Sequence, residues 1–65
     1  MTLLLNGEPR EVAAETLAQV LDELGYAGRV VATAVNGDFV AARKRETVTL
    51  AEGDRIEVVA PMQGG

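Results

Sequence analysis

The chain has 65 residues, 48% of them hydrophobic, and its ten acidic and six basic residues leave a formal net charge of −4. That length predicts one small domain, and the lack of cysteine excludes disulfides, a thiol nucleophile and zinc-finger spacing. Histidine, the commonest general base and metal ligand, is also missing. The negative charge argues against nucleic acid or an anionic membrane and favours a basic partner surface. The sequence shows no signal peptide or long apolar span, so we expect a cytoplasmic protein.

The first two predicted strands form a hairpin. Residues 2–5 read as a strand, Asn6-Gly7 is a strong signal for a tight hairpin turn, and residues 8–13 return as a second strand. Pro9 cannot donate a hydrogen bond to a sheet, so the second strand is expected at an edge. The unbroken leucines of the first strand favour a more central position.

The predicted helix begins at Thr16. Thr16 and Gln19 have the spacing of a capping box, in which each side chain accepts a hydrogen bond from the other residue's backbone N–H. Gly25 stands where a left-handed residue would end the helix. A single apolar stripe follows from the positions of Leu17, Val20, Leu21 and Leu24.

The rest of the chain predicts three further strands. Residues 30–35 form the third, the Asn36-Gly37-Asp38 turn leads into residues 39–41, and a turn at residues 52–54 precedes the last strand, residues 55–60. The order is β-β-α-β-β-β. This order predicts an α+β fold in which one main helix packs on one face of a mixed five-stranded sheet. The other face of the sheet is then uncovered.

Two charged clusters invite a chemical interpretation. Asp22 and Glu23 could form an acid/base pair, but they point away from the apolar stripe and are expected to be solvated surface. The basic run at residues 43–45 is flanked by Glu46, and we expect a solvated loop there rather than a phosphate site.

Alternation along the strands predicts a docking surface on the uncovered face. It places Val59 and Leu4 outside, with Leu3, Leu5, Ile56 and Val58 under the helix. If the first and last strands are neighbours, Leu4 and Val59 form an apolar patch beside the root of the tail, and Val35 extends it. Ordinary exposed surface is the alternative interpretation.

The last five residues are expected to be a flexible tail beyond a domain of residues 1–60. Pro61 ends the strand because it has no N–H. Gly64 and Gly65 bring only backbone atoms into whatever site receives them, and they present an unhindered carboxylate. Met62 and Gln63 are expected to be threaded into the partner with them. A frayed chain end is the alternative.

With these features the chain resembles the ubiquitin-like sulfur carriers, and most closely the ThiS family. The resemblance covers essentially the whole chain and rests on Asn6-Gly7 after the first strand, the helix that ends at Leu24-Gly25, and three further motifs, at residues 34–37, 50–59 and 64–65. It implies a β-grasp (ubiquitin-like) fold. Members often carry Val-Pro-Arg after the second hairpin turn, where this chain has Val-Ala-Ala and then Arg43, which puts partner contacts of that segment in doubt.

The resemblance implies a chemistry as well. An E1-like adenylating enzyme (ThiF-like) would use ATP to adenylate the Gly65 carboxylate, and sulfur from a cysteine desulfurase would displace AMP to leave a thiocarboxylate, 1-thioglycine. A thiazole synthase (ThiG-like) would then receive the sulfur. The chain would be a carrier and co-substrate, with no active site, cofactor or metal of its own. The alternatives are the molybdopterin-synthase small subunit, another ubiquitin-like carrier or modifier, and a β-grasp protein-interaction domain.

Overall fold

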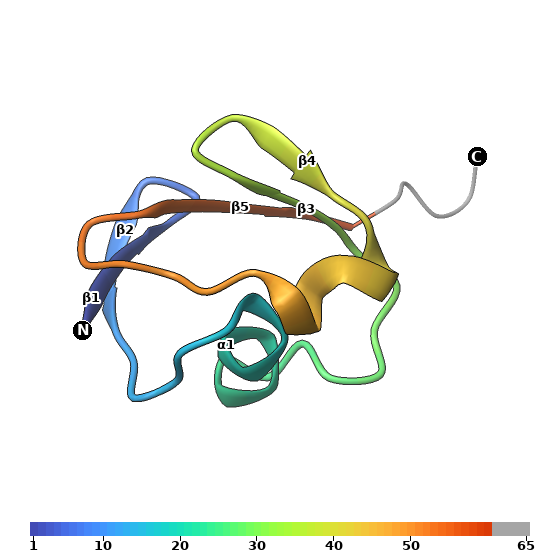
Figure 1. Cartoon of the computed structure of the whole chain (residues 1–65), viewed down its shortest axis with the longest axis horizontal. Coiled ribbons are helices and arrows are strands. Elements are labelled where there is room, and N and C mark those ends of the chain that lie inside the picture. Colours follow the sequence, from blue (N-terminus) through green and yellow to red (C-terminus); the bar gives the residue numbers. More distant parts are fainter. Residues whose placement is uncertain (61–65) are drawn as a thin grey trace.

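A computed structural model describes residues 1–60, which form a five-stranded sheet with one α-helix on one face (Figure 1). In chain order the elements are β1 (Thr2–Leu5), β2 (Glu8–Glu11), α1 (Leu17–Glu23), β3 (Ala32–Val35), β4 (Asp38–Val40), the 3₁₀ helix η1 (Ala42–Thr47) and β5 (Arg55–Val59). The predicted order and the predicted layers are therefore confirmed. The 3₁₀ helix was not predicted.

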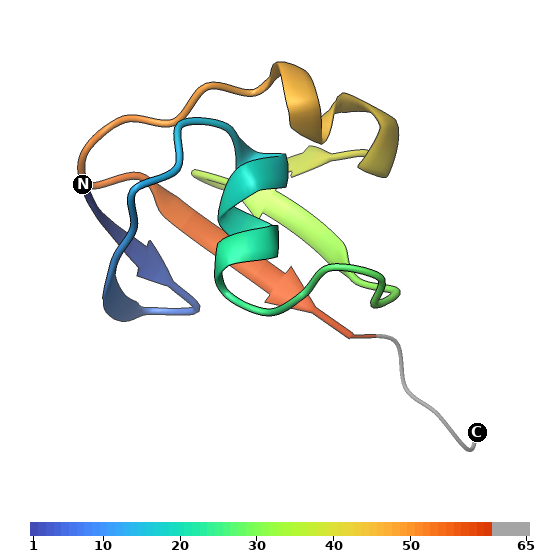
Figure 2. The ribbon, with the colours of Figure 1, turned by 90° about the horizontal axis from the view of Figure 1, so that it is seen from below.

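The strands lie in the order β2-β1-β5-β3-β4. The central strand β5 runs parallel to β1 and antiparallel to β3, so the sheet is mixed, as expected. The first and last strands are neighbours, which was the condition set for the predicted docking surface. Strand β2 lies at an edge, as Pro9 predicted. Figure 2 shows that β1 and β5 run in the same direction and that α1 crosses in front of the sheet, over one of its faces.

Both hairpins turn on Asn-Gly pairs. Asn6 and Asn36 have φ values of 50° and 51°, and the glycines that follow them have φ values of 86° and 88°. Two consecutive residues with positive φ define the turn that matches the twist of antiparallel strands, and asparagine and glycine tolerate that conformation best. The hairpins are confirmed, although β2 ends at Glu11 and β3 begins only at Ala32, two residues inside their predicted bounds.

The caps of α1 are also confirmed. The Thr16 hydroxyl accepts from the Gln19 N–H at 3.2 Å, and the Gln19 amide oxygen accepts from the Thr16 N–H at 3.2 Å. At the other end Gly25 has φ 90°, its N–H donates to the Asp22 carbonyl, and the Tyr26 N–H donates to the Leu21 carbonyl at 2.8 Å. This pair of hydrogen bonds is the usual way in which a helix ends at a left-handed glycine. Seven residues are too few for a stable isolated helix, so packing must hold α1 in place.

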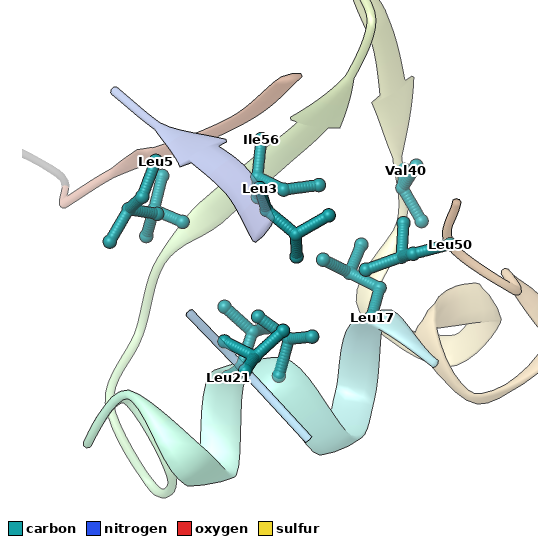
Figure 3. Close-up of a cluster of buried hydrophobic side chains, with 10 residues drawn as sticks. Leu3, Leu5, Leu17, Leu21, Val40, Leu50 and Ile56 are labelled. Carbon is teal, nitrogen blue, oxygen red and sulfur yellow. The ribbon is translucent and has the colours of Figure 1, made fainter. Parts of the chain in front are cut away.

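The core fills the space between α1 and the sheet (Figure 3). Leu17 and Val20 are fully buried and Leu21 is nearly so, whereas Leu24 at the end of the stripe is half-buried. The sheet and the connections supply Leu3, Leu5, Val12, Val40, Leu50, Ile56 and Val58. Among residues 1–60 we find no helix that is long and apolar enough to cross a membrane.

Candidate functional site

The face of the sheet opposite α1, here called the outer face, carries exposed side chains along β5. Ile56 and Val58 are buried, while Arg55, Glu57 and Val59 are exposed. Figure 1 shows α1 on one side of the sheet only. The predicted alternation of β5 is therefore confirmed, and Val59 points outward.

An apolar patch lies on this face around Val59. Ala32 is directly opposite Val59, and Ala34 is directly opposite both Phe39 and Glu57. Directly opposite residues project from the same face of a sheet. Phe39 is 73% exposed and Val59 is 62% exposed, and a shallow hollow lies between them. We call Ala32, Ala34, Phe39 and Val59 the outer patch.

The outer patch borders the point where the chain leaves the sheet. Val59 is the last residue of β5, and Ala60 is the last described residue. The patch therefore adjoins the root of the expected tail. The predicted tail residues Met62, Gln63, Gly64 and Gly65 lie outside the described residues, and their roles remain predictions.

Sequence analysis missed Phe39. Its neighbour Val40 is buried, so alternation across this short strand turns Phe39 outward. The signal was available in the Asn36-Gly37 turn, because a two-residue turn sets the pairing of the strands that it joins.

The position predicted for Leu4 is wrong in part. Leu4 does lie on the outer face, but its partner on β5 is Arg55, at the start of that strand. Val59 comes four residues later, about 13 Å away at roughly 3.3 Å per residue. Because β1 pairs only with the first part of β5, Leu4 lies away from the root of the tail.

The direction predicted for Val35 is wrong. Val35 is directly opposite Ile56, which is 1% exposed on the helix side of the sheet. Val35 therefore shares that side, where it packs against the core. It cannot extend the outer patch.

A polar network explains why β3 faces this way. Thr33 is only 2% exposed, and its hydroxyl donates to the Val40 carbonyl at 2.8 Å and accepts from Arg45 Nε at 3.1 Å. Arg45 Nη2 also donates to the Val31 carbonyl at 2.7 Å. With these bonds a buried hydroxyl is satisfied, so burying it carries little penalty.

The same network corrects the expectation for the basic run. Residues 43–45 lie within η1, and Arg45 is half-buried and hydrogen-bonded to Thr33 of β3 and to Val31 just before it, rather than free in solvent. Arg43 and Lys44 are exposed, as expected.

The carboxylate of Glu23 has a structural role. It accepts hydrogen bonds from the N–H groups of Ala13 and Ala14, each at 3.1 Å, and so fixes the connection from β2 to α1. Ala13, Ala14 and Glu23 line an open hollow on the surface, and Asp22 lines it as well. In the part of the chain that the structure describes, no three His, Cys, Asp or Glu side chains are grouped as metal ligands.

Comparison with known proteins places these features in context. The model of the ThiS family matches residues 3–65. The chain is 43% identical over 61 residues to the sulfur carrier protein ThiS of Thermus thermophilus, covering 94% of this chain and 95% of that one. It is also 38% identical over 66 residues to a thiazole synthase of Paramagnetospirillum magneticum, covering the whole of this chain but only 20% of the relative.

Two solved structures of a thiamine biosynthesis protein from Geobacter metallireducens resemble this one. The crystal structure, of a protein described as ThiS, has a TM-score of 0.83 and 30% identity, with both chains fully covered. The solution structure has a TM-score of 0.78 and 28% identity, and it covers all of this chain and 88% of the other.

Proposed function

This chain belongs to the ThiS family of sulfur carrier proteins of thiamine biosynthesis, and from that membership we propose that Gly65 is the residue that carries the sulfur. Its fold is the ubiquitin-like β-grasp. The match to the family extends over residues 3–65 and so includes the terminal glycine pair. That extent is the observation that carries the proposal.

The proposed chemistry activates a carboxylate. A carboxylate is a poor electrophile because it would have to expel an oxide ion. Adenylation by ATP releases pyrophosphate and gives an acyl-phosphate anhydride, from which AMP departs readily when a sulfur nucleophile attacks. The outer sulfur of a persulfide on a cysteine desulfurase would attack the acyl carbon and expel AMP, giving an acyl disulfide. A thiol reductant would then cleave the S–S bond, leaving the thiocarboxylate on Gly65 and the free thiol on the desulfurase. The carrier itself supplies an unhindered glycine on a chain segment that contains little side chain.

The recipient of the sulfur in this proposal is a thiazole synthase-like enzyme. A segment similar to this whole chain occupies a fifth of a protein named thiazole synthase, which supports a working relationship between the two. The activation step requires an E1-like adenylating enzyme. This chain would then be a co-substrate of both partners, with ATP bound by the activating enzyme.

We further propose that the outer patch docks onto these partners. Val59 and Phe39 are large apolar side chains left exposed on a small domain, and such groups commonly mark interaction surfaces. They lie beside the root of the tail. A partner that holds the outer patch would therefore hold the start of the tail in a fixed position, which favours a productive approach of the carboxylate to ATP.

Intact mass spectrometry tests the role of Gly65. The chain is incubated with ATP, a ThiF-like adenylating enzyme and a sulfur source, and we expect one terminal oxygen to be replaced by sulfur. Deleting Gly65, adding one alanine after it, or replacing Gly64 with valine should each prevent the exchange. All three variants should melt like the parent chain, since the changes lie beyond the domain of residues 1–60.

The outcomes separate the alternatives. If the alanine-extended chain gains sulfur without being trimmed, Gly65 is not the carrier residue. High-mass adducts in place of sulfur would indicate a conjugated modifier. Binding to partners that is insensitive to all three changes would indicate a protein-interaction domain.

A further inference from the structure

The charges of this acidic protein are separated along its length. Four of the six basic residues, Arg29, Arg43, Lys44 and Arg45, lie in two short segments. In Figure 1 both segments, η1 and the connection from α1 to β3, lie toward the side at which β5 finishes, and Figure 2 shows the connection beside the end of β5 and η1 at the other end of α1. We call this side, at which β5 finishes, the basic end.

Hydrogen bonds tie η1 to that end. Arg45 Nη2 donates to the Val31 carbonyl at 2.7 Å, and Val31 directly precedes Ala32, the partner of Val59. The chain leaves the sheet after Val59. The basic segment is thus anchored next to the strand pair from which the expected tail departs.

Acidic side chains gather at the opposite end, where β5 begins. Asp54 immediately precedes β5, and its carboxylate accepts from the Asn36 side chain in the turn that leads to Asp38. Glu52 accepts from the Thr2 N–H, and Glu11 accepts from the Thr2 hydroxyl. These four carboxylates are separated from the basic end by the length of β5, about 13 Å at roughly 3.3 Å per residue.

The basic end is not neutralised by its surroundings within residues 1–60. The two ion pairs there join Met1 to Glu11 and Arg10 to Glu8, and neither involves the basic end. Glu46 is the one acidic residue of η1. With Glu46 counted, the basic end contributes +3, and since the chain carries −4 the remainder of the molecule carries −7. The charge of the molecule is therefore unevenly distributed. The basic end is positive although the protein as a whole is negative.

We propose that the basic end steers the protein, tail first, onto an acidic surface that surrounds the tail-receiving site of the adenylating enzyme. This inference rests on the proposed function and adds the charge of the partner surface. An acidic surface attracts the basic end and repels the rest of the molecule, so productive orientations are enriched before contact. Steering of this kind raises association rates by about 10- to 1,000-fold and weakens as salt is added.

A pair of charge reversals tests the proposal. Lys44→Glu reverses a charge in the basic end, and Arg10→Glu makes the same change of two units on β2, away from it. Both side chains are exposed, and the Arg10–Glu8 contact at 4.0 Å is a surface ion pair of little energetic weight. Melting curves should match the parent for both variants. Arg43→Glu serves as an independent second reversal in the basic end.

The measurement is the association rate with the ThiF-like adenylating enzyme, by stopped flow, over a range of salt concentrations. At low salt we expect Lys44→Glu to slow association by about tenfold and Arg10→Glu by no more than about twofold. The difference should vanish at high salt, because screening shortens the range of the interaction. Dissociation rates should hardly change.

Equal slowing by Lys44→Glu and Arg10→Glu would show that net charge alone matters and would overturn the proposal. Faster association of Lys44→Glu would show that the partner surface is basic, with the same consequence. Sulfur transfer at saturating enzyme, followed by intact mass, separates this inference from the proposed function. A parent chain that never gains sulfur refutes the function. If the parent and the variants all gain sulfur but their stopped-flow association rates at low salt do not differ, only the steering is refuted.

Discussion

Replacing Phe39 with alanine is the sharpest test of the outer patch. A phenylalanine side chain offers about 150–250 Å² of surface. Since Phe39 is 73% exposed, about 110–180 Å² of it remains available to a partner. At about 25 cal/mol per Å², burying this area would contribute at most about 3–4.5 kcal/mol. The measured loss of binding free energy should be smaller than this upper bound, because the alanine side chain keeps part of the contact and because ordering side chains at an interface costs free energy.

We therefore expect Phe39→Ala to weaken binding to the adenylating enzyme by about 1–3 kcal/mol, measured by titration calorimetry. The melting temperature should hardly change, because the side chain contributes little to the core. Val30→Ala is the matched control, since Val30 is 78% exposed but lies in the connection before β3, outside the outer patch. If the two variants bind alike, the reasoning about the outer patch is refuted.

Three further predictions concern stability. Leu21→Ala should destabilise the fold by about 2–5 kcal/mol in urea melts, a large part of the total for so small a domain; a loss below about 0.5 kcal/mol would mean that α1 does not pack as described. Thr16→Ala removes the hydroxyl that caps α1 and should cost about 0.5–2 kcal/mol by the same measurement, whereas an unchanged midpoint would deny the cap any role. The Thr2 hydroxyl, and then the Met1 ammonium, lower the pKa of Glu11, so its contribution to stability is complete above the unfolded-state pKa and is lost as pH falls through the folded-state pKa. Glu11→Gln should thus be slightly less stable than the parent near neutral pH and equal to it in acid, and a difference that grows in acid would contradict the assignment.

Local signals accounted for the elements of this fold. Three features depend only on the conformational preferences of a few adjacent residues: the Asn-Gly turns, the capping box at Thr16 and the left-handed Gly25. The surrounding tertiary structure hardly changes these preferences. The alternation of β5 was equally secure, since Ile56 and Val58 stand out from charged neighbours. The η1 helix carried no such signal, because its side chains show no apolar period.

The composition of the candidate site depended on tertiary structure instead. Strand order and register decided that Phe39 and Ala34 stand beside Glu57, and that Leu4 lies at the far end of β5. The direction of Val35 followed from the burial of Thr33, which is possible only because Arg45 and Val40, distant in sequence, satisfy its hydroxyl. The sequence alone thus determined the turns, the caps and the strand pattern, because their causes are local. It also showed the family motif at Gly64-Gly65 directly. Which side chains share a surface was decided by the folded structure, because pairing and buried hydrogen bonds join residues that the chain keeps far apart.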